Sequence, residues 1–163
     1  MRPPLNPPPP EQRRQIYAVA RQLHMSIADE YGRPRMELRG ENCALPEASW
    51  TADQIVLWRI SDALNPSMQL DATVLERVLL KTVQINPPST TLKLLVRCNL
   101  ALSVHSRLHQ TGRIVSHTIF TQVLRLIDEI DDLAWDLVDG HVPWWYSLTV
   151  PFQALRTLLA MDT

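Results

Sequence analysis

Two histidines, His105 and His109, have a spacing that could bind a metal ion. Residues four apart share one face of a helix, so two imidazoles at this spacing can hold zinc. The metalloprotease form of this pattern also needs a glutamate directly after the first histidine, and Ser106 stands there. No third ligand is apparent. We therefore expect two partly exposed histidines near a helix end and assign no metal site.

A dense acidic segment is the second group that could do chemistry. Its members are Asp128, Glu129, Asp131, Asp132, Asp136 and Asp139. Di-metal carboxylate bundles draw ligands from Glu-x-x-His motifs on facing helices, and this sequence contains none. The acidic residues alternate with an apolar stripe, which indicates the solvated face of an amphipathic helix for most of them. An acidic face that meets a basic partner is the alternative.

The remaining residue types give little support for catalysis. The four glycines are isolated from one another, so neither a phosphate loop nor a dinucleotide fingerprint can form. Cys43 and Cys98 lie far apart, have no neighbouring histidine in sequence, and indicate reduced thiols. The formal net charge of -1 gives no basic field for nucleic acids. We assign no catalytic and no DNA-binding residue.

Helices must position these groups. Residues 1–10 are dominated by proline, which fixes φ and removes hydrogen-bond donors, so we expect a stiff linker. A ligand for proline-binding domains is the alternative. Residues 11–163 form the domain, and no stretch in it shows sustained apolar–polar alternation. The expected fold is all-α, an array of about six helices.

The first three helices have recognisable ends. The first begins at Glu11 and ends at Gly32 and Pro34, because glycine permits the left-handed conformation and proline cannot continue. Its expected inward residues are Ile16, Val19, Leu23, Ile27 and Tyr31. The second follows the capping-box sequence Thr51–Gln54. The third follows Asp71, whose carboxylate can cap the first turn. The expected inward residues of the third helix are Val74, Leu75, Val78, Leu79 and Val83.

The last three helices carry most of the apolar residues. The helix Leu92–Leu108 is apolar on nearly every face, which predicts a position in the middle of the bundle with Cys98 buried. The next helix has an inward stripe of Ile119, Val123, Leu126, Ile127, Ile130, Leu133 and Leu137. The last helix begins at Pro151, a favoured first-turn residue. Its expected apolar face, whose partner helices we expect to be missing, is Phe152, Leu155, Leu158, Leu159 and Met161.

Two segments resemble one known family. The first runs from Arg13 to Pro46, and its matching residues are Arg13, Arg14, Gly32, Arg33, Pro34, Leu45 and Pro46. They resemble the signature of the fungal-specific transcription factor domain, the middle homology region of zinc binuclear cluster regulators. The second segment is similar to a later part of the same domain. Its matching residues are Trp144, Trp145, Pro151, Phe152, Gln153 and the run Leu158–Thr163.

The sequence also departs from this family. Tyr17 stands where many members have Trp or Phe, and His24 stands where Asp or Asn is frequent. The six-cysteine zinc cluster that binds DNA in the family is absent, because two distant cysteines cannot hold its metal pair. We therefore expect no cofactor in this chain, and DNA contact only through that missing cluster. The resemblance implies a location in the nucleus. It also implies that the helical array, residues 11–163, is part of a larger helical regulatory domain and is incomplete at both ends.

The paired tryptophans admit two interpretations. Core packing is the simpler one, since Trp144 and Trp145 bring large apolar areas. The resemblance implies another, in which they line an effector pocket or an interface. The residues of that pocket or interface would be Trp144, Trp145, Phe152, Leu155 and Leu159.

Three functions remain open from the sequence. The first is a non-catalytic regulatory domain of a fungal transcription factor, which controls RNA polymerase II transcription by binding a small apolar effector or a partner. The second is a stand-alone helical interaction module that forms homo- or heterodimers with related regulators. The third is a helical metalloenzyme that uses His105, His109 and the acidic segment. No apolar run reaches the ~20 residues of a membrane span, so no membrane partner is expected.

Overall fold

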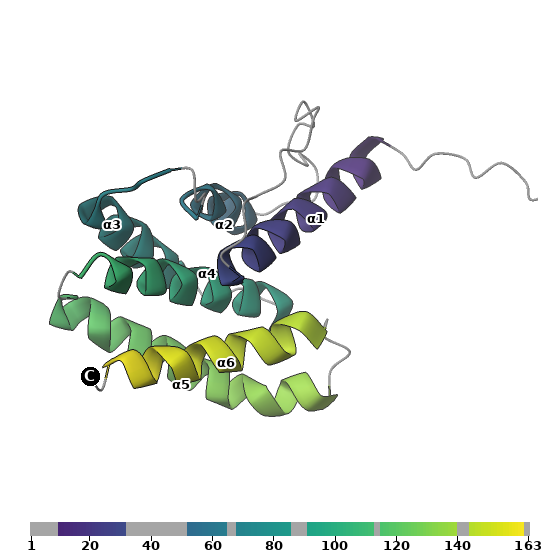
Figure 1. Cartoon of the computed structure of the whole chain (residues 1–163). Coiled ribbons are helices and arrows are strands. Elements are labelled where there is room, and N and C mark those ends of the chain that lie inside the picture. The colour runs from purple at the N-terminus through teal and green to yellow at the C-terminus, as the bar shows by residue number, and fades with distance from the viewer. Residues whose placement is uncertain are drawn as a thin grey trace, which may run out of the picture.

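The chain folds into an array of α-helices (Figure 1). The computed structural model describes residues 10–31, 52–64, 68–85, 91–112, 115–139 and 144–161, with side chains except at 52–55, 62, 92, 131–139 and 144–147. Among these residues there are six helices and no strand, which confirms the all-α prediction. The helices are α1 (Pro10–Glu30), α2 (Ala52–Asp62), α3 (Ala72–Val83), α4 (Thr91–Gln110), α5 (His117–Asp139) and α6 (Trp144–Met161).

Helix α4 lies in the middle of the array. Figure 1 shows α1, α2 and α3 on one side of it and α5 and α6 on the other, and α4 contacts every one of them. The apolar side chains that it buries are Leu95, Cys98, Leu100, Ala101, Leu102, Val104 and Leu108. A helix that is apolar on nearly every face needs partners all round it. The predicted central position of this helix and the burial of Cys98 are both confirmed.

Helix α1 buries a different face from the one that we expected. Ile16, Val19 and Tyr31 are exposed, so their assignment to the inward stripe is wrong. The residues that α1 buries are Ala18, Met25, Ser26 and Ala28. Helix α1 contacts α2 and α4, and three of its four buried side chains are small. Small side chains permit close packing between helices, so a buried face need not carry the largest apolar residues. The guanidinium of Arg21 then stacks 4.3 Å from the ring centroid of Trp58 on α2.

Helices α3 and α5 bury most of the stripes that we predicted. In α3, Leu75 and Leu79 are buried, but Val74 is 36% exposed and was wrongly placed inward. Asp71 is the N-cap of α3, yet its side chain makes no capping hydrogen bond. In α5 the buried stripe is Ile119, Val123, Leu126 and Ile130, with Ile127 partly buried against the core. The side chains of Leu133 and Leu137 lie outside the described residues.

Helix α6 begins at Trp144, so the prediction that it begins at Pro151 is wrong. Pro151 lies inside the helix, where it removes the hydrogen bond to the carbonyl of Ser147 at a cost of up to about 3 kcal/mol. The helix continues because its inner face is held by packing against α4 and α5. The residues of that face are Thr149, Val150, Gln153, Ala154 and Thr157. Tertiary contact therefore outweighs one lost backbone hydrogen bond.

The start of α1 agrees with the local preference of proline. Helix α1 begins at Pro10, a position where proline is favoured because its missing N–H is not needed, and residues 1–9 lie outside the described residues. The capping-box residue Thr51 also lies outside them. None of the helices in the described part of the chain combines the length and the apolar character that crossing a membrane requires.

Candidate functional site

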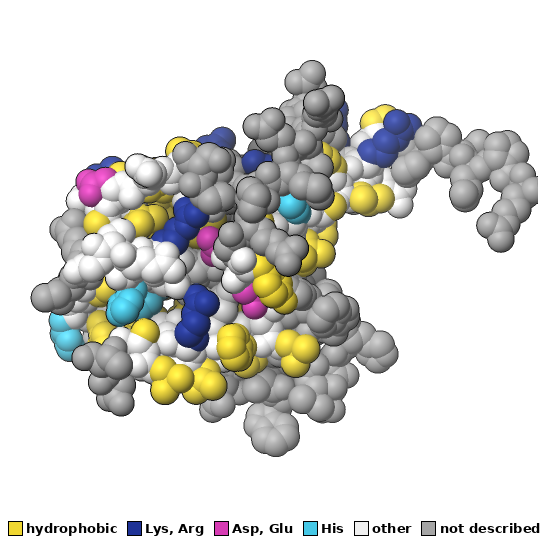
Figure 2. All heavy atoms as spheres, viewed as in Figure 1, with side chains coloured by type: hydrophobic (Ala, Val, Ile, Leu, Met, Phe, Trp, Pro, Cys, Tyr) yellow, Lys and Arg dark blue, Asp and Glu magenta, His cyan; other side chains and the backbone are white. Residues whose placement is uncertain are grey.

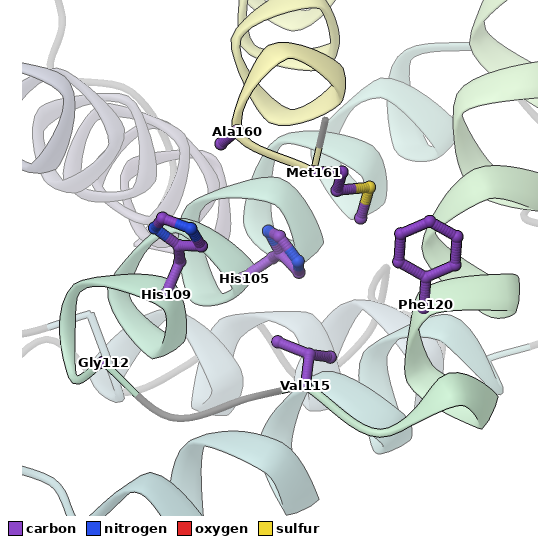
Figure 3. A pocket seen from close by; sticks show the side chains of 7 residues that line it. All are labelled: His105, His109, Gly112, Val115, Phe120, Ala160 and Met161. Atoms are coloured by element: carbon purple, nitrogen blue, oxygen red, sulfur yellow. The ribbon is translucent and has the colours of Figure 1, made fainter. Parts of the chain in front are cut away.

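A cavity of about 360 Å³ opens beside the carboxyl-terminal end of α4 (Figure 3). Three parts of the chain form its walls: the end of α4 with its following turn, the start of α5, and the end of α6. The lining residues are His105, His109, Gly112, Val115, Phe120, Ala160 and Met161. Known small-molecule sites have volumes of roughly 300–1,000 Å³, so this cavity is large enough for a ligand.

His105 is the buried polar group of this cavity. Its side chain is 2% exposed, whereas His109, one turn later, is exposed, so the prediction of two partly exposed histidines is wrong for His105. Burial disfavours the charged imidazole and, with a smaller repulsion from His109, lowers the pKa of His105 to about 4. The ring is therefore neutral at physiological pH. Among the described residues, none forms a hydrogen bond with it.

The predicted metal chemistry can be compared with the described side chains. No three His, Cys, Asp or Glu side chains within the described part of the chain come together in a way that could hold a metal ion. In the acidic segment Asp128 is exposed, as expected for a solvated face. The side chains of Asp131, Asp132, Asp136 and Asp139 lie outside the described residues.

Glu129 has a structural role that the sequence did not indicate. It forms an ion pair with Arg97 of α4, whose side chain is 2% exposed while that of Glu129 is 43% exposed. Arg97 also donates a hydrogen bond of 2.8 Å to the carbonyl of Ile85, after the end of α3. A buried guanidinium needs such partners, because an unpaired buried charge is costly. The pair therefore joins α4 to α5 and to the chain after α3.

Two more arginines join the central helix to its neighbours. Arg107 donates a hydrogen bond of 3.0 Å to the carbonyl of Ala63, and its Nε lies 3.4 Å from a carboxylate oxygen of Asp29. Arg156 of α6 donates a hydrogen bond of 2.8 Å to the hydroxyl of Ser106. Sequence analysis missed these contacts. These contacts could have been expected from the arginines inside largely apolar helices, because a buried arginine is nearly always paired with a polar group.

The outer face of α6 carries an exposed apolar row. Its members, which we call the α6 row, are Leu148, Phe152, Leu155 and Leu159, with exposed fractions of 67%, 61%, 54% and 63%. Their spacing of four, three and four residues places them along one stripe of the helix. Figure 2 shows hydrophobic side chains gathered over α6 on the visible face. Leu158 is also exposed, whereas Met161, which we expected on this face, is partly buried against the core and lines the cavity.

The residues that carry the family resemblance are only partly described. Arg13 and Arg14 lie on α1, and Arg14 pairs with Glu11 at 3.7 Å. Gly32, Arg33, Pro34, Leu45 and Pro46 lie outside the described residues, as do the side chains of Trp144 and Trp145 at the start of α6.

The other signature residues lie along α6. Gln153 is 3% exposed and faces inward, whereas Phe152 faces outward. Phe152, Leu155 and Leu159 were predicted to line an effector pocket or an interface. The structure places all three in the α6 row, and none of them lines the cavity.

Comparison with known proteins relates this chain to fungal transcription factors. It is 34% identical over 156 residues to transcription factor kojR of Aspergillus flavus and, with the same figures, of Aspergillus oryzae. It is 31% identical over 159 residues to Protein RDR1 of Gibberella zeae. Each alignment covers 94% of this chain, and the chain spans only 28% of the length of these curated relatives. No family model and no solved structure matches the sequence.

These relationships confirm the resemblance that the two sequence segments indicated. The chain is homologous to a segment of fungal transcription factors.

Proposed function

We propose that this chain is a non-catalytic regulatory segment of a fungal transcription factor that acts in the nucleus and controls RNA polymerase II transcription through contacts with another helix. The observation that carries the proposal is the α6 row. An exposed apolar stripe of this regularity is typical of a surface that packs against a partner. Homology over 94% of the chain to kojR supports the transcriptional setting.

The size of the α6 row favours a partner within the same protein over a separate one. Complete burial of an exposed Leu or Phe is worth ~1.5–3 kcal/mol, and these four side chains are already about two-fifths covered. After ordering costs, each contributes about 1 kcal/mol, so the row supplies about 4 kcal/mol. That free energy corresponds to a dissociation constant in the millimolar range. Separate molecules would rarely associate at such an affinity.

A helix in the same chain is present at an effective concentration of about millimolar, so it would occupy the row about half of the time. An equilibrium near this balance is one that an effector or a partner can shift in either direction. The relatives offer room for such a helix, because this chain covers 28% of their length. We therefore propose an amphipathic helix elsewhere in the full-length factor as the occupant of the α6 row.

The test replaces the homologous segment of Aspergillus oryzae kojR by this chain and measures transcription of a reporter gene. We expect the chimera to regulate the reporter, and the double variant Phe152→Glu, Leu155→Glu to lose that regulation at an equal protein level. Arg125→Glu on α5, an exposed position outside the row, is the matched control and should behave as the parent. Equal transcription from the chimera and the double variant would contradict the proposal.

Self-association is the competing use of the same surface. It predicts that the molar mass of the isolated chain in light scattering rises with concentration and that Leu155→Glu abolishes the rise. That result would show that a second copy of the chain, and not a helix of the same protein, occupies the α6 row.

A further inference from the structure

The imidazole of His105 faces a cavity and forms no hydrogen bond with a described residue. Figure 3 shows this side chain projecting from α4 into the space between Val115, Phe120 and Met161. It is 2% exposed, and no described residue forms a hydrogen bond with it. Its nitrogens are not among the fully buried side-chain atoms that lack a partner, so they remain accessible from the cavity. A polar group that faces a cavity forms its hydrogen bond with water or with a bound molecule. A ligand that carries a hydrogen-bonding group would take the place of that water.

The cavity walls favour an apolar ligand, and Phe120 and Met161 favour an aromatic one. Most of the lining is apolar and consists of Val115, Phe120, Ala160 and Met161. The flexible thioether of Met161 can make favourable contacts with an aromatic ring. Gly112 has a φ of 70°, and apart from its chain neighbours no residue comes within 4 Å of the point where its Cβ would be. This part of the wall therefore leaves open space beside the turn after α4.

The volume sets the size of the ligand. A dry cavity of about 150 Å³ lined by aliphatic and aromatic side chains is enough to bind benzene. The present cavity of about 360 Å³ therefore has room for two fused rings.

The charge of the cavity lining restricts which ligands can bind. His105 is neutral, and no described lysine or arginine side chain lines the cavity. A carboxylate ligand would enter this apolar space without a positive partner, which is unfavourable. A hydroxyl group instead can donate to one imidazole nitrogen or accept from the other, whichever tautomer is present.

We propose that the cavity at the end of α4 binds a small, uncharged aromatic molecule that carries a hydroxyl group, and that His105 forms the hydrogen bond that orients it. The site is separate from the α6 row. Ligand binding can therefore be measured whether or not the chain regulates transcription, and the two proposals can fail independently.

The experiment titrates the whole chain at neutral pH with three probes: 2-naphthol, naphthalene and 2-naphthoate. We expect 2-naphthol to bind about three- to tenfold more tightly than naphthalene, the range of one net hydrogen bond, and 2-naphthoate to bind most weakly. Failure of 2-naphthol to bind at millimolar concentration would overturn the proposal. Equal affinities for 2-naphthol and naphthalene would overturn it as well.

Substitution of the histidine tests its role. In His105→Phe we expect the preference for 2-naphthol over naphthalene to disappear, because the ring shape is kept while the hydrogen-bonding atoms are lost. The preference compares two probes on one variant, so a general change in stability affects both alike. His24→Phe on α1, the same substitution away from the cavity, should keep the preference. A preference that survives in His105→Phe would refute the assignment.

A spectroscopic measurement covers the case in which His105→Phe does not fold. In the parent chain, the ring nitrogen resonances of His105 should shift on addition of 2-naphthol and not on addition of naphthalene. Unchanged resonances at saturating 2-naphthol would place the ligand elsewhere and overturn the proposal.

Discussion

Acid should destabilise this chain through His105. The ring has a pKa of about 4 in the folded state, because burial opposes the charged form, against an ordinary value of 6.5. As the pH falls below 6.5, the unfolded chain takes up a proton at this site while the folded chain does not. The free energy of unfolding therefore decreases from about pH 6.5 down to about pH 4, and this residue causes no further loss below that.

The magnitude follows from the difference between the two pKa values. Each pKa unit corresponds to 1.36 kcal/mol, so the interval from 6.5 to about 4 is worth about 3 kcal/mol in full and about 2 kcal/mol by about pH 5. A domain has a total free energy of unfolding of roughly 5–15 kcal/mol. Protonation of one side chain would thus remove a large share of the stability.

Urea denaturation followed by circular dichroism at about pH 7.5 and about pH 5 measures the effect. Other groups also contribute to the pH dependence of stability, among them Glu30, whose pKa is raised mainly by burial. Subtracting the result for His105→Phe cancels them, because that variant lacks only the imidazole. We expect the parent chain to lose about 2 kcal/mol more than the variant. If parent and variant lose equal amounts, His105 does not titrate as a buried neutral ring, and His105→Gln would repeat the comparison in a variant that stays polar.

Three further predictions address the core and α6. Glu129→Ala should lower the free energy of unfolding by about 2 kcal/mol, since it leaves the buried guanidinium of Arg97 without its anion. Urea denaturation measures this change, and a loss below about 0.5 kcal/mol would show that water compensates the charge. Burial raises the pKa of the Cys98 thiol to about 12. In a Cys43→Ser variant, iodoacetamide should therefore alkylate Cys98 only as fast as the protein unfolds. Rapid labelling of the folded protein, detected by mass spectrometry, would count against this prediction. Pro151→Ala should stabilise the chain by about 1–3 kcal/mol by restoring the backbone N–H inside α6, and a decrease in thermal stability would show that packing of the proline ring matters more.

Local sequence patterns were sufficient to predict that the chain forms helices and which helix lies in the middle of the fold. Apolar periodicity and breaking residues located the helices, because helix formation depends on neighbours along the chain. The central position of α4 followed from one property, apolar residues on nearly every face, since only a helix surrounded by others can bury them. The exposed side chains of Phe152 and Leu155 likewise follow the predicted stripe of the last helix.

The faces of individual helices were harder to predict. The pattern of α1 favoured Ile16 and Val19, yet the structure buries Ala18 and Ala28, because the distance between helices decides which side chains fit. Pro151 indicated a helix start from local chemistry alone. Packing of the inner face of α6 against α4 and α5 overrides that signal.

The sequence by itself determined the class of the fold, the middle helix and the kinship with fungal transcription factors, because these depend on periodicity and on residue identity along the chain. Only the tertiary structure decided the candidate site. His105 is buried because the start of α5 and the end of α6 meet over the end of α4, and Arg97 meets Glu129 across 32 residues of sequence. Contacts between segments so far apart depend on the packing of whole helices, which no local pattern encodes.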